Sequence, residues 1–400
     1  MAFIRNRKLL IVTIVAVLLL LTQLDLDNFV SIFDVTKHIY SLNFLSRQTK
    51  PVICVLVLAC NRPSVKRCLD SVFKYRVLTP SVNFPVIVSQ DCGSHPETTQ
   101  VIKSYGDKIL HIHQPDLSAI ITDGTTKQGY YKQARHHAWA LKQAFYEFKC
   151  PNVIVLEDDL EVAPDFFEYF AATLPLYLQD TSILCVTASN LQAKPGIVNM
   201  SAINLLHRTD FFFGWGWMIS KKVFKSLGSW PKVYWDVWLG LPDERQGRSC
   251  IRPEIPRTKN FGRDGTSGHK FFDDLVQDLV VSKDFIPFTT LNLSYLLRDN
   301  YNRRLSQQVS ESKLITNLPG FELGLSSNKY KEGLSFHVLY HDPLEFRLLT
   351  KYFRLYGKTW NGIAHSMYRG IMTFIHRGRR IYLVPNGEWK GYDTDVDLHI

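Results

Sequence analysis

Apolar runs alternate with amphipathic segments through the first half of the chain. Short runs rich in Val, Ile and Leu predict buried strands at residues 52–59, 85–89, 109–113 and 153–156. Apolar residues at helical spacing predict a helix after Pro63, another over 133–148 and a third from Pro164 onward. Because strands alternate with helices, we expect an α/β fold with a mostly parallel sheet.

The pattern becomes less regular after about residue 180. A strand is predicted near 183–185, and the segment 211–217 (FFFGWGW) combines aromatic rings with two glycines. Such rings stack on sugars or pack in a core, and the sequence leaves both interpretations open. The glycine-rich segment 260–269 is predicted to be a loop able to fold over a ligand. The final hundred residues predict a smaller α+β unit with a hairpin of strands 371–375 and 380–384.

The N-terminus has the pattern of a membrane anchor. Three basic residues precede an apolar run from Leu9 to Leu24, and no small-x-small cleavage site follows. We therefore expect an uncleaved, single-pass type II signal anchor with the rest of the chain in the lumen. The short span suits the thinner membranes of the early secretory pathway. The expected division is a cytosolic tail 1–8, an anchor 9–24, a stem 25–50, a main domain 51–300 and a C-terminal domain 301–400.

Composition and charge limit the classes of molecule that the chain is expected to bind. The chain of 400 residues has a formal net charge of +10, which suits anionic ligands or membrane surfaces, although a generally basic solvated surface accounts for most of it. The charge is not gathered in one basic run and no nucleic-acid-binding motif is present, so nucleic acid is not expected as a partner. Seven cysteines in a lumenal domain imply disulfides, and the odd number leaves at least one thiol free.

Three consecutive carboxylates, Glu157, Asp158 and Asp159, stand where the strand 153–156 should end. The carboxyl ends of strands in an open α/β sheet face the ligand crevice, and crowded carboxylates there favour a cation. Hard divalent ions such as Mg²⁺ or Mn²⁺ take oxygen ligands and are often shared with substrate phosphates. The alternative is that the acids cap the next helix, but the predicted start at Pro164 lies a full turn too late. The triplet therefore predicts a metal–diphosphate site.

Residues 155–170 (VLEDDLEVAPDFFEYF) closely resemble the signature of the N-acetylglucosaminyltransferase I family. Further segments that resemble the family are VSQDCG at 88–93, QGYYK at 128–132, ARH at 134–136, RQGR at 245–248, RPE at 252–254 and YRGI at 368–371. The resemblance runs from about residue 51 to about residue 395. It implies a GT-A type nucleotide-sugar transferase fold with a small C-terminal domain. It also implies inverting transfer of N-acetylglucosamine (GlcNAc) from UDP-GlcNAc, in β1,2 linkage, to a terminal α-mannose of a Man5-type N-glycan.

The resemblance assigns roles to individual residues. It implies that Asp159 is the direct Mn²⁺ ligand and that Glu157 and Asp158 contact the sugar and ribose of the donor. The residues that match those holding uridine and phosphate are Arg62, Asp91 and His136. A guanidinium suits phosphate because it stays charged and binds with paired N–H groups. The residues that match the donor-covering loop are Thr266 and Ser267.

Asp236, within YWDVW at 234–238, matches the catalytic base of the family. An inverting transfer needs a base that takes the proton of the acceptor hydroxyl on the side opposite the leaving group. Aromatic neighbours such as Trp235 can form a sugar platform and raise the pKa of the carboxylate by desolvation. Without the resemblance, the favoured interpretations are an exposed loop acid for Asp236 and a solvated helix histidine for His136.

Disulfide pairing follows from the resemblance for four cysteines. It implies the pairs Cys60–Cys92 and Cys185–Cys250, with Cys68 free and buried. Cys54 and Cys150 are additional, and they stand six residues before Cys60 and seven before Glu157. A third bridge between them is a hypothesis, whose alternative is two buried thiols.

Several positions depart from the family pattern, namely Ser189, Leu191, Phe213 and Val237. These changes bear on acceptor preference more than on reaction type and indicate a divergent member or paralogue in the Golgi membrane. The nearest alternative is a protein O-mannose β1,2-GlcNAc transferase, whose members usually carry a long sugar-binding stem that is missing here. An alternative of another class is a catalytically silent lectin-like or assembly partner. A silent protein need not keep every donor, metal and base position of the family. This chain keeps five of them, namely Arg62, Asp91, Glu157, Asp159 and Asp236, which argues against that alternative.

Overall fold

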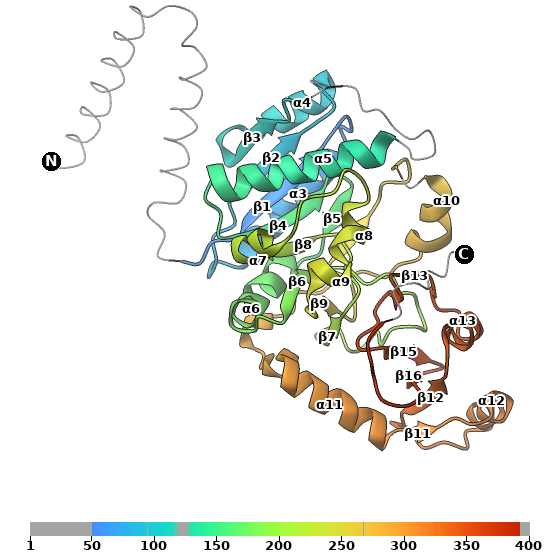
Figure 1. Ribbon diagram of the computed structural model, residues 1–400. Helices are drawn as coiled ribbons and strands as arrows, with labels where there is room; N and C mark the ends of the chain where they lie inside the picture. The colour runs from blue at the N-terminus through green and yellow to red at the C-terminus, as the bar shows by residue number, and fades with distance from the viewer. Residues whose placement is uncertain (1–49, 94, 117, 119–127, 267, 393–400) are drawn as a thin grey trace, which may run out of the picture.

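The computed structural model describes residues 50–93, 95–116, 118, 128–266 and 268–392. The described chain forms a large part around an eight-stranded sheet and, towards the C-terminus, a part around a four-stranded sheet (Figure 1). The predicted cytosolic tail, anchor and nearly all of the stem lie outside the described residues. Within the described ranges, no helix is long and apolar enough to cross a membrane.

The predicted N-terminal strands form one half of the large sheet. They run parallel in the order β3-β2-β1-β4, with the bounds β1 (Cys54–Ala59), β2 (Val86–Gln90), β3 (Ile109–His113) and β4 (Asn152–Glu157). The helices in this half are α3 (Val65–Tyr75), α4 (Pro96–Lys103), α5 (Gln128–Lys142), which continues as a π-helical turn over Gln143–Glu147, and α6 (Phe166–Gln179). The strand predictions in this half and the α/β class are confirmed.

The other half of the large sheet has mixed direction. Strand β8 (Trp217–Ser220) lies antiparallel between β4 and β6 (Ile183–Thr187), and the sheet continues through β9 (Ser249–Pro253) to β7 (Leu206–Thr209). A separate antiparallel pair consists of β5 (Leu160–Val162) and β10 (Thr258–Asn260). The short connecting helices are α7 (Lys221–Ser226), α8 (Trp235–Leu239), α9 (Pro242–Arg245) and α10 (His269–Phe271). Parallel pairs remain in the majority, as predicted, but the reversal at β8 has no counterpart in the hydrophobic pattern.

The C-terminal part is built on a smaller sheet in the order β11-β12-β16-β15. Its elements are α11 (Arg298–Glu311), β11 (Lys313–Leu314), α12 (Leu318–Ser326), β12 (Phe336–Tyr340), α13 (Pro343–Tyr352), β13 (Thr359–Trp360), β14 (Ile363–Ala364), β15 (Met372–His376) and β16 (Arg379–Pro385). The predicted hairpin is confirmed as β15–β16. Its two-residue turn has positive φ at both Arg377 and Gly378, which is the geometry that matches strand twist in a tight hairpin.

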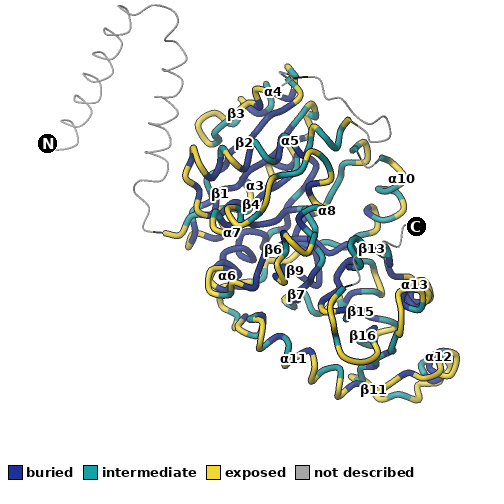
Figure 2. The backbone as a smooth tube through the Cα atoms, in the orientation of Figure 1, coloured by how far each residue is buried: buried dark blue, intermediate teal, exposed yellow. Residues whose placement is uncertain are grey.

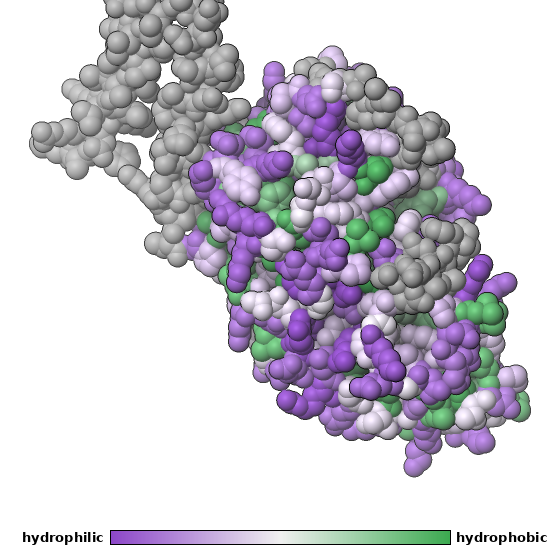
Figure 3. Space-filling view, viewed as in Figure 1, coloured by the Kyte–Doolittle hydropathy of each residue, from purple (hydrophilic) through white to green (hydrophobic). Residues whose placement is uncertain are grey.

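Apart from its edge strand β3, which is half-buried, the large sheet is buried on both faces (Figure 2). Alternate residues of β1 point to opposite sides: Val55 and Val57 join a core that includes α3 and α6, whereas Leu56 joins a second core that includes α5. This two-sided burial explains why the strand is an unbroken apolar run. The first core also includes Tyr368 and Tyr382 from the C-terminal part, so the two parts share packed side chains. On the face shown in Figure 3, the outer surface is largely hydrophilic with scattered apolar patches.

Three disulfides stabilise the described chain. The expected pairs Cys60–Cys92 and Cys185–Cys250 are present, with Cα atoms 5.2 and 4.6 Å apart. Cys54 also pairs with Cys150, which confirms the third bridge. The pairing follows from strand register, because Cys54 lies beside Val153 on the neighbouring strand and Cys150 precedes that strand by two residues. Cys68 is free and buried, as expected.

Candidate active site

A cavity of about 670 Å³ opens at the carboxyl edge of the parallel strands. Strands β1, β2 and β4 end side by side there, since Leu58 lies level with Glu157 and Ala59 lies level with Gln90. Of the residues proposed from the sequence, those that line this cavity are Arg62, Asp91, His136, Glu157, Asp158, Asp159 and Thr266. Ser267 lies outside the described residues. Segments more than 200 residues apart in sequence therefore meet at one site.

Two of the three carboxylates in the acidic triplet pair with Arg62, which follows β1. Arg62 donates from Nη1 to Asp159 at 2.8 Å and from Nη2 to Asp158, so one guanidinium spans two carboxylates. The attraction of these carboxylates outweighs burial and raises the pKa of Arg62. Burial nevertheless raises the pKa of Asp158 to about 6, against the effect of Arg62. Burial, with repulsion from Asp159, raises the pKa of Glu157 to about 8.

The end of β10 and the loop that follows it contact Asp159. The backbone N–H of Phe261 donates to the Asp159 carbonyl at 2.9 Å, and the Asn260 amide lies 3.4 Å from the Asp159 carboxylate. Gly262 lies so close that an added Cβ would sit 2.1 Å from Asp159 Oδ2. Only glycine fits there without displacing the carboxylate. Asn260 and Gly262 were not singled out as site residues from the sequence, although the glycine-rich segment 260–269 was predicted to lie over a ligand.

Asp91 and His136 form the other wall of the cavity. Asp91 follows β2, its N–H donates to the Ala59 carbonyl at 2.9 Å, and burial raises the pKa of its carboxylate against the attraction of Arg135 and Lys132. His136 comes from α5 and its Nε2 lies 2.8 Å from the Ser89 hydroxyl. Burial lowers the pKa of His136 to about 3, so the ring is neutral at physiological pH.

Lys132, an exposed residue near the start of α5, also lines the cavity. Lys132 belongs to the family-like segment QGYYK at 128–132, but its sequence context alone assigned it no role. The signal available was a cation in a segment that resembles the family and directly precedes ARH at 134–136.

Trp235 and Asp236 are placed on α8, next to the cavity but not among the side chains that line it. The Trp235 ring is buried and stacks on His137 at a centroid distance of 4.1 Å, so it packs in the core rather than offering a free face. Asp236 is exposed to solvent, yet desolvation by the surrounding protein raises the pKa of its carboxylate. Its charge contributes to the raised pKa of Glu157, so the two carboxylates lie within electrostatic reach.

The aromatic–glycine segment divides between the two interpretations left open by its sequence. Trp215 lines the cavity, whereas Trp217 is fully buried in the second core. Phe213 packs against Trp215 with ring centroids 4.7 Å apart. One of the two tryptophans is therefore available to a ligand and the other is a core residue.

The oxygen donors of the cavity suit a hard divalent ion. Among the described residues, no group of three or more His, Cys, Asp or Glu side chains is arranged to hold a metal by itself. Mg²⁺ and ions like it need only one or two carboxylates when substrate phosphates and waters supply the remaining ligands. Asp158 and Asp159, whose charge already attracts a guanidinium, fit a cation site that a diphosphate completes.

The protein has an α/β fold, and the cavity at this edge of the sheet is lined by both carboxylates and cationic side chains. Comparison with known proteins goes further: the model of the GNT-I family matches residues 29–396. The chain belongs to the GNT-I family. A relative from Arabidopsis thaliana, alpha-1,3-mannosyl-glycoprotein 2-beta-N-acetylglucosaminyltransferase, is 34% identical over 338 residues, which is 84% of this chain and 74% of that protein.

Solved structures resemble the chain only weakly. The mannosyltransferase PcManGT from Pyrobaculum calidifontis, in complex with GDP-Man and Mn²⁺, matches with a TM-score of 0.34 and 13% identity over 56% of this chain and 65% of that one. TarS 1–349 from S. aureus, in complex with UDP-GlcNAc, matches with a TM-score of 0.32 and 11% identity over 60% of this chain and 62% of that one. Likenesses of this size carry no argument about function.

Proposed function

We propose that this protein transfers GlcNAc from UDP-GlcNAc to the 2-hydroxyl of a terminal α-mannose of an N-glycan, with inversion. The observation that carries the proposal is that Arg62, Asp91, His136 and the triplet 157–159 line one cavity in a chain of the GNT-I family. The cavity volume is in the range of small-molecule sites. The acceptor follows by analogy with the Arabidopsis relative, whose name specifies an α-1,3-mannosyl glycoprotein. We propose a Man5-type glycan as that acceptor.

The donor would lie along the carboxyl edge of the sheet. Mn²⁺, with Asp159 as its protein ligand, would neutralise the diphosphate and the charge that develops on UDP as it leaves. Arg62 would exchange its carboxylate partners for phosphate oxygens, with Lys132 as a second cation on the same cavity. Asp91 and the neutral His136 would hold the uridine, and the Cys60–Cys92 disulfide ties the end of β2, which carries Asp91, to the end of β1.

Asp236 would act as the base. A carboxylate whose pKa is raised by desolvation is a better proton acceptor, and its exposure leaves room for a sugar to approach. It would take the proton of the mannose 2-hydroxyl while the hydroxyl oxygen attacks the anomeric carbon in one displacement. Buried Trp235 would position Asp236 by anchoring α8. Thr266 and Ser267 would belong to the loop that covers the donor.

We further propose that residues 9–24 anchor the protein in the Golgi membrane as a single-pass type II protein with its catalytic part in the lumen. Three disulfides suit an oxidising compartment, which supports a lumenal location.

The test is a transfer assay with UDP-GlcNAc, MnCl₂ and either a Man5 N-glycan or an O-mannosyl peptide. We expect transfer to the N-glycan, and transfer only to the O-mannosyl peptide would favour the alternative O-mannose activity. The variant Asp236→Asn should bind UDP-GlcNAc like the parent but turn over about 100-fold more slowly. Binding of UDP by the parent without transfer to any mannoside would instead favour a silent lectin-like protein.

A further inference from the structure

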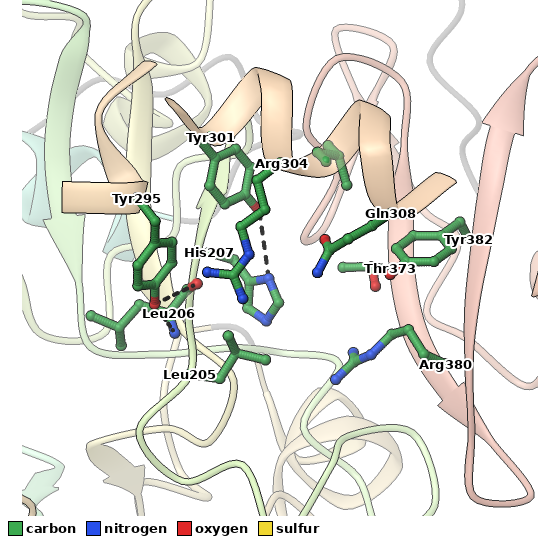
Figure 4. Close-up of a pocket in the computed structure, with 11 residues that line it drawn as sticks. Leu205, Leu206, His207, Tyr295, Tyr301, Arg304, Gln308, Thr373, Arg380 and Tyr382 are labelled. Atoms are coloured by element: carbon green, nitrogen blue, oxygen red, sulfur yellow. Dashed lines mark hydrogen bonds between the residues drawn. The ribbon is translucent and has the colours of Figure 1, made fainter. Parts of the chain in front are cut away.

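A second cavity lies on the side of the molecule where α11 crosses the C-terminal sheet, away from the site described above. It holds about 50 Å³ and lies between α11, β7 and the β15–β16 hairpin (Figure 4). The side chains that line it are Leu205, Leu206, His207, Tyr295, Tyr301, Arg304, Leu305, Gln308, Thr373, Arg380 and Tyr382. None of them lines the first cavity. The second cavity therefore needs an explanation of its own.

The carboxylate of Glu254 pairs with two of the side chains that line this cavity. Glu254 accepts from His207 Nε2 at 2.7 Å, from Arg380 Nη2 at 2.9 Å and from the Asn199 N–H at 2.8 Å. These donors and the nearby charges lower the pKa of Glu254 despite its burial. Burial lowers the pKa of His207 to about 4, so its ring adds no charge at neutral pH. Glu254 thus offsets one positive charge, that of Arg380.

The charges of two further arginines, Arg304 and Arg252, are not offset by Glu254. Arg304 reaches the cavity from α11 and lies over the Tyr295 ring at 4.4 Å, without an ion pair to any described carboxylate. Arg252 is buried, and its charge acts on both Glu254 and Tyr301. Arg380 and Arg252 act on the single charge of Glu254, and Arg304 adds a third positive charge at the cavity, which leaves the region with a surplus of positive charge.

Buried hydrogen-bond donors without partners also indicate that this region binds an anion. Among the described residues, Arg380 Nη1 and Arg252 Nε are buried polar atoms that make no hydrogen bond. Buried polar groups are almost always paired, and each exception calls for a partner such as water or an ion. In Figure 4, the Arg304, Arg380 and Gln308 side chains point into the same space from two different elements.

We propose that this cavity binds a small tetrahedral oxyanion, inorganic phosphate or sulfate. A buried water needs roughly 10–15 Å³ of such volume, so a cavity of about 50 Å³ accommodates about four oxygen-sized atoms. Four oxygens at donor distance would meet the Arg304 and Arg380 guanidinium groups, the Gln308 amide and the Thr373 hydroxyl. Such an anion would link α11 to the β15–β16 hairpin, so it would stabilise the C-terminal part.

The test is titration calorimetry with inorganic phosphate at constant ionic strength, on the full lumenal chain. We expect one phosphate bound, with an affinity at least about tenfold lower in Arg304→Met, because a charge-assisted contact is lost. Arg304 is exposed, so this variant should fold. The matched control is Arg303→Met, which removes an exposed charge from the same helix without touching the cavity and should bind like the parent.

Phosphate could also bind at the first cavity, so the same titration is run on Arg62→Met. The proposal expects the heat that is sensitive to Arg304 to persist in that variant, whatever happens at the nucleotide site. The thermal unfolding midpoint should rise with phosphate in the parent and in Arg303→Met but rise less in Arg304→Met. No phosphate binding by the parent, or equal affinity in Arg304→Met and Arg303→Met, would overturn the proposal. Neither result would bear on the proposed transferase activity.

Discussion

Replacing Arg62 by methionine perturbs the candidate site at the point where charge is most concentrated. The Arg62 side chain is 31% exposed, but the Asp158 and Asp159 side chains that it pairs with are only 2% and 6% exposed. Removing one partner from a buried ion pair costs about 3–5 kcal/mol, because the other charge stays buried without compensation. We expect the low end of that range, about 3 kcal/mol, because Asp158 also accepts from the Cys60 N–H and Asp159 also lies near the Asn260 amide.

The loss should be measurable by thermal unfolding in EDTA. Unfolding entropy is about 2.1 cal/mol/K per residue, so roughly 330 described residues give about 0.7 kcal/mol/K, and a loss of 3 kcal/mol lowers the midpoint by about 4 °C. The matched control is Arg67→Met, because Arg67 pairs with Glu161 where the two side chains are 48% and 39% exposed. Exposed pairs contribute at most about 1 kcal/mol, so this control should shift the midpoint by about 1 °C.

Adding Mn²⁺ without nucleotide distinguishes the loss of the Arg62 charge from a general loss of stability caused by the substitution. In the parent the ion must displace Arg62 from Asp159, whereas in Arg62→Met the carboxylates are already free of that partner. Mn²⁺ should therefore raise the midpoint of Arg62→Met more than that of the parent. If Arg62→Met unfolds no earlier than Arg67→Met in EDTA, or if Mn²⁺ raises the midpoints of Arg62→Met and the parent equally, the reasoning about this site is wrong.

Two other predictions concern stability. Replacing Cys54 and Cys150 together by alanine should cost about 4 kcal/mol in denaturant unfolding, since the bridge closes a sequence separation of 96 residues that the Cys60–Cys92 bridge shortens. Alkylation of the denatured, unreduced parent should label Cys68 alone, and labelling of three cysteines would refute the third bridge. Burial lowers the pKa of His365 to about 3 among the rings of Phe211, Phe213 and Tyr356. The unfolded chain therefore binds more protons between pH 6.5 and 3, and His365 costs about 2 kcal/mol of stability on going from pH 7 to pH 5. His365→Phe should lose about that much less over the same interval in denaturant unfolding, and an unchanged pH dependence would contradict this reasoning.

Much of the parallel half of the fold was predictable because β1, β2 and β4 are buried on both faces. A continuous apolar run such as 52–59 has few alternatives to a central strand, and its polar end marks the ligand edge of the sheet. The same logic placed the acidic triplet beside a cavity. Register accounts for the Cys54–Cys150 bridge, which spacing alone left open.

The mixed half of the sheet was harder to predict from the sequence. Strand β8 is only four residues long and starts inside an aromatic–glycine segment, so no periodicity reveals that it runs antiparallel between β4 and β6. The partners of Arg62 were also out of reach, because they depend on where two strand ends separated by almost 100 residues come together. Trp235 illustrates a further limit: an aromatic beside a carboxylate suggested a sugar platform, whereas its ring is packed against His137.

We propose that carboxylates at the end of β4 hold a divalent ion that carries the diphosphate of a nucleotide sugar. The most direct measurement is the affinity of the protein for UDP with MnCl₂, with EDTA, and in the variant Asp159→Ala with MnCl₂. The account predicts tight binding only for the parent with the metal, and at least tenfold weaker binding in the other two cases. UDP binding that is unchanged by chelation and by loss of the Asp159 carboxylate would contradict it.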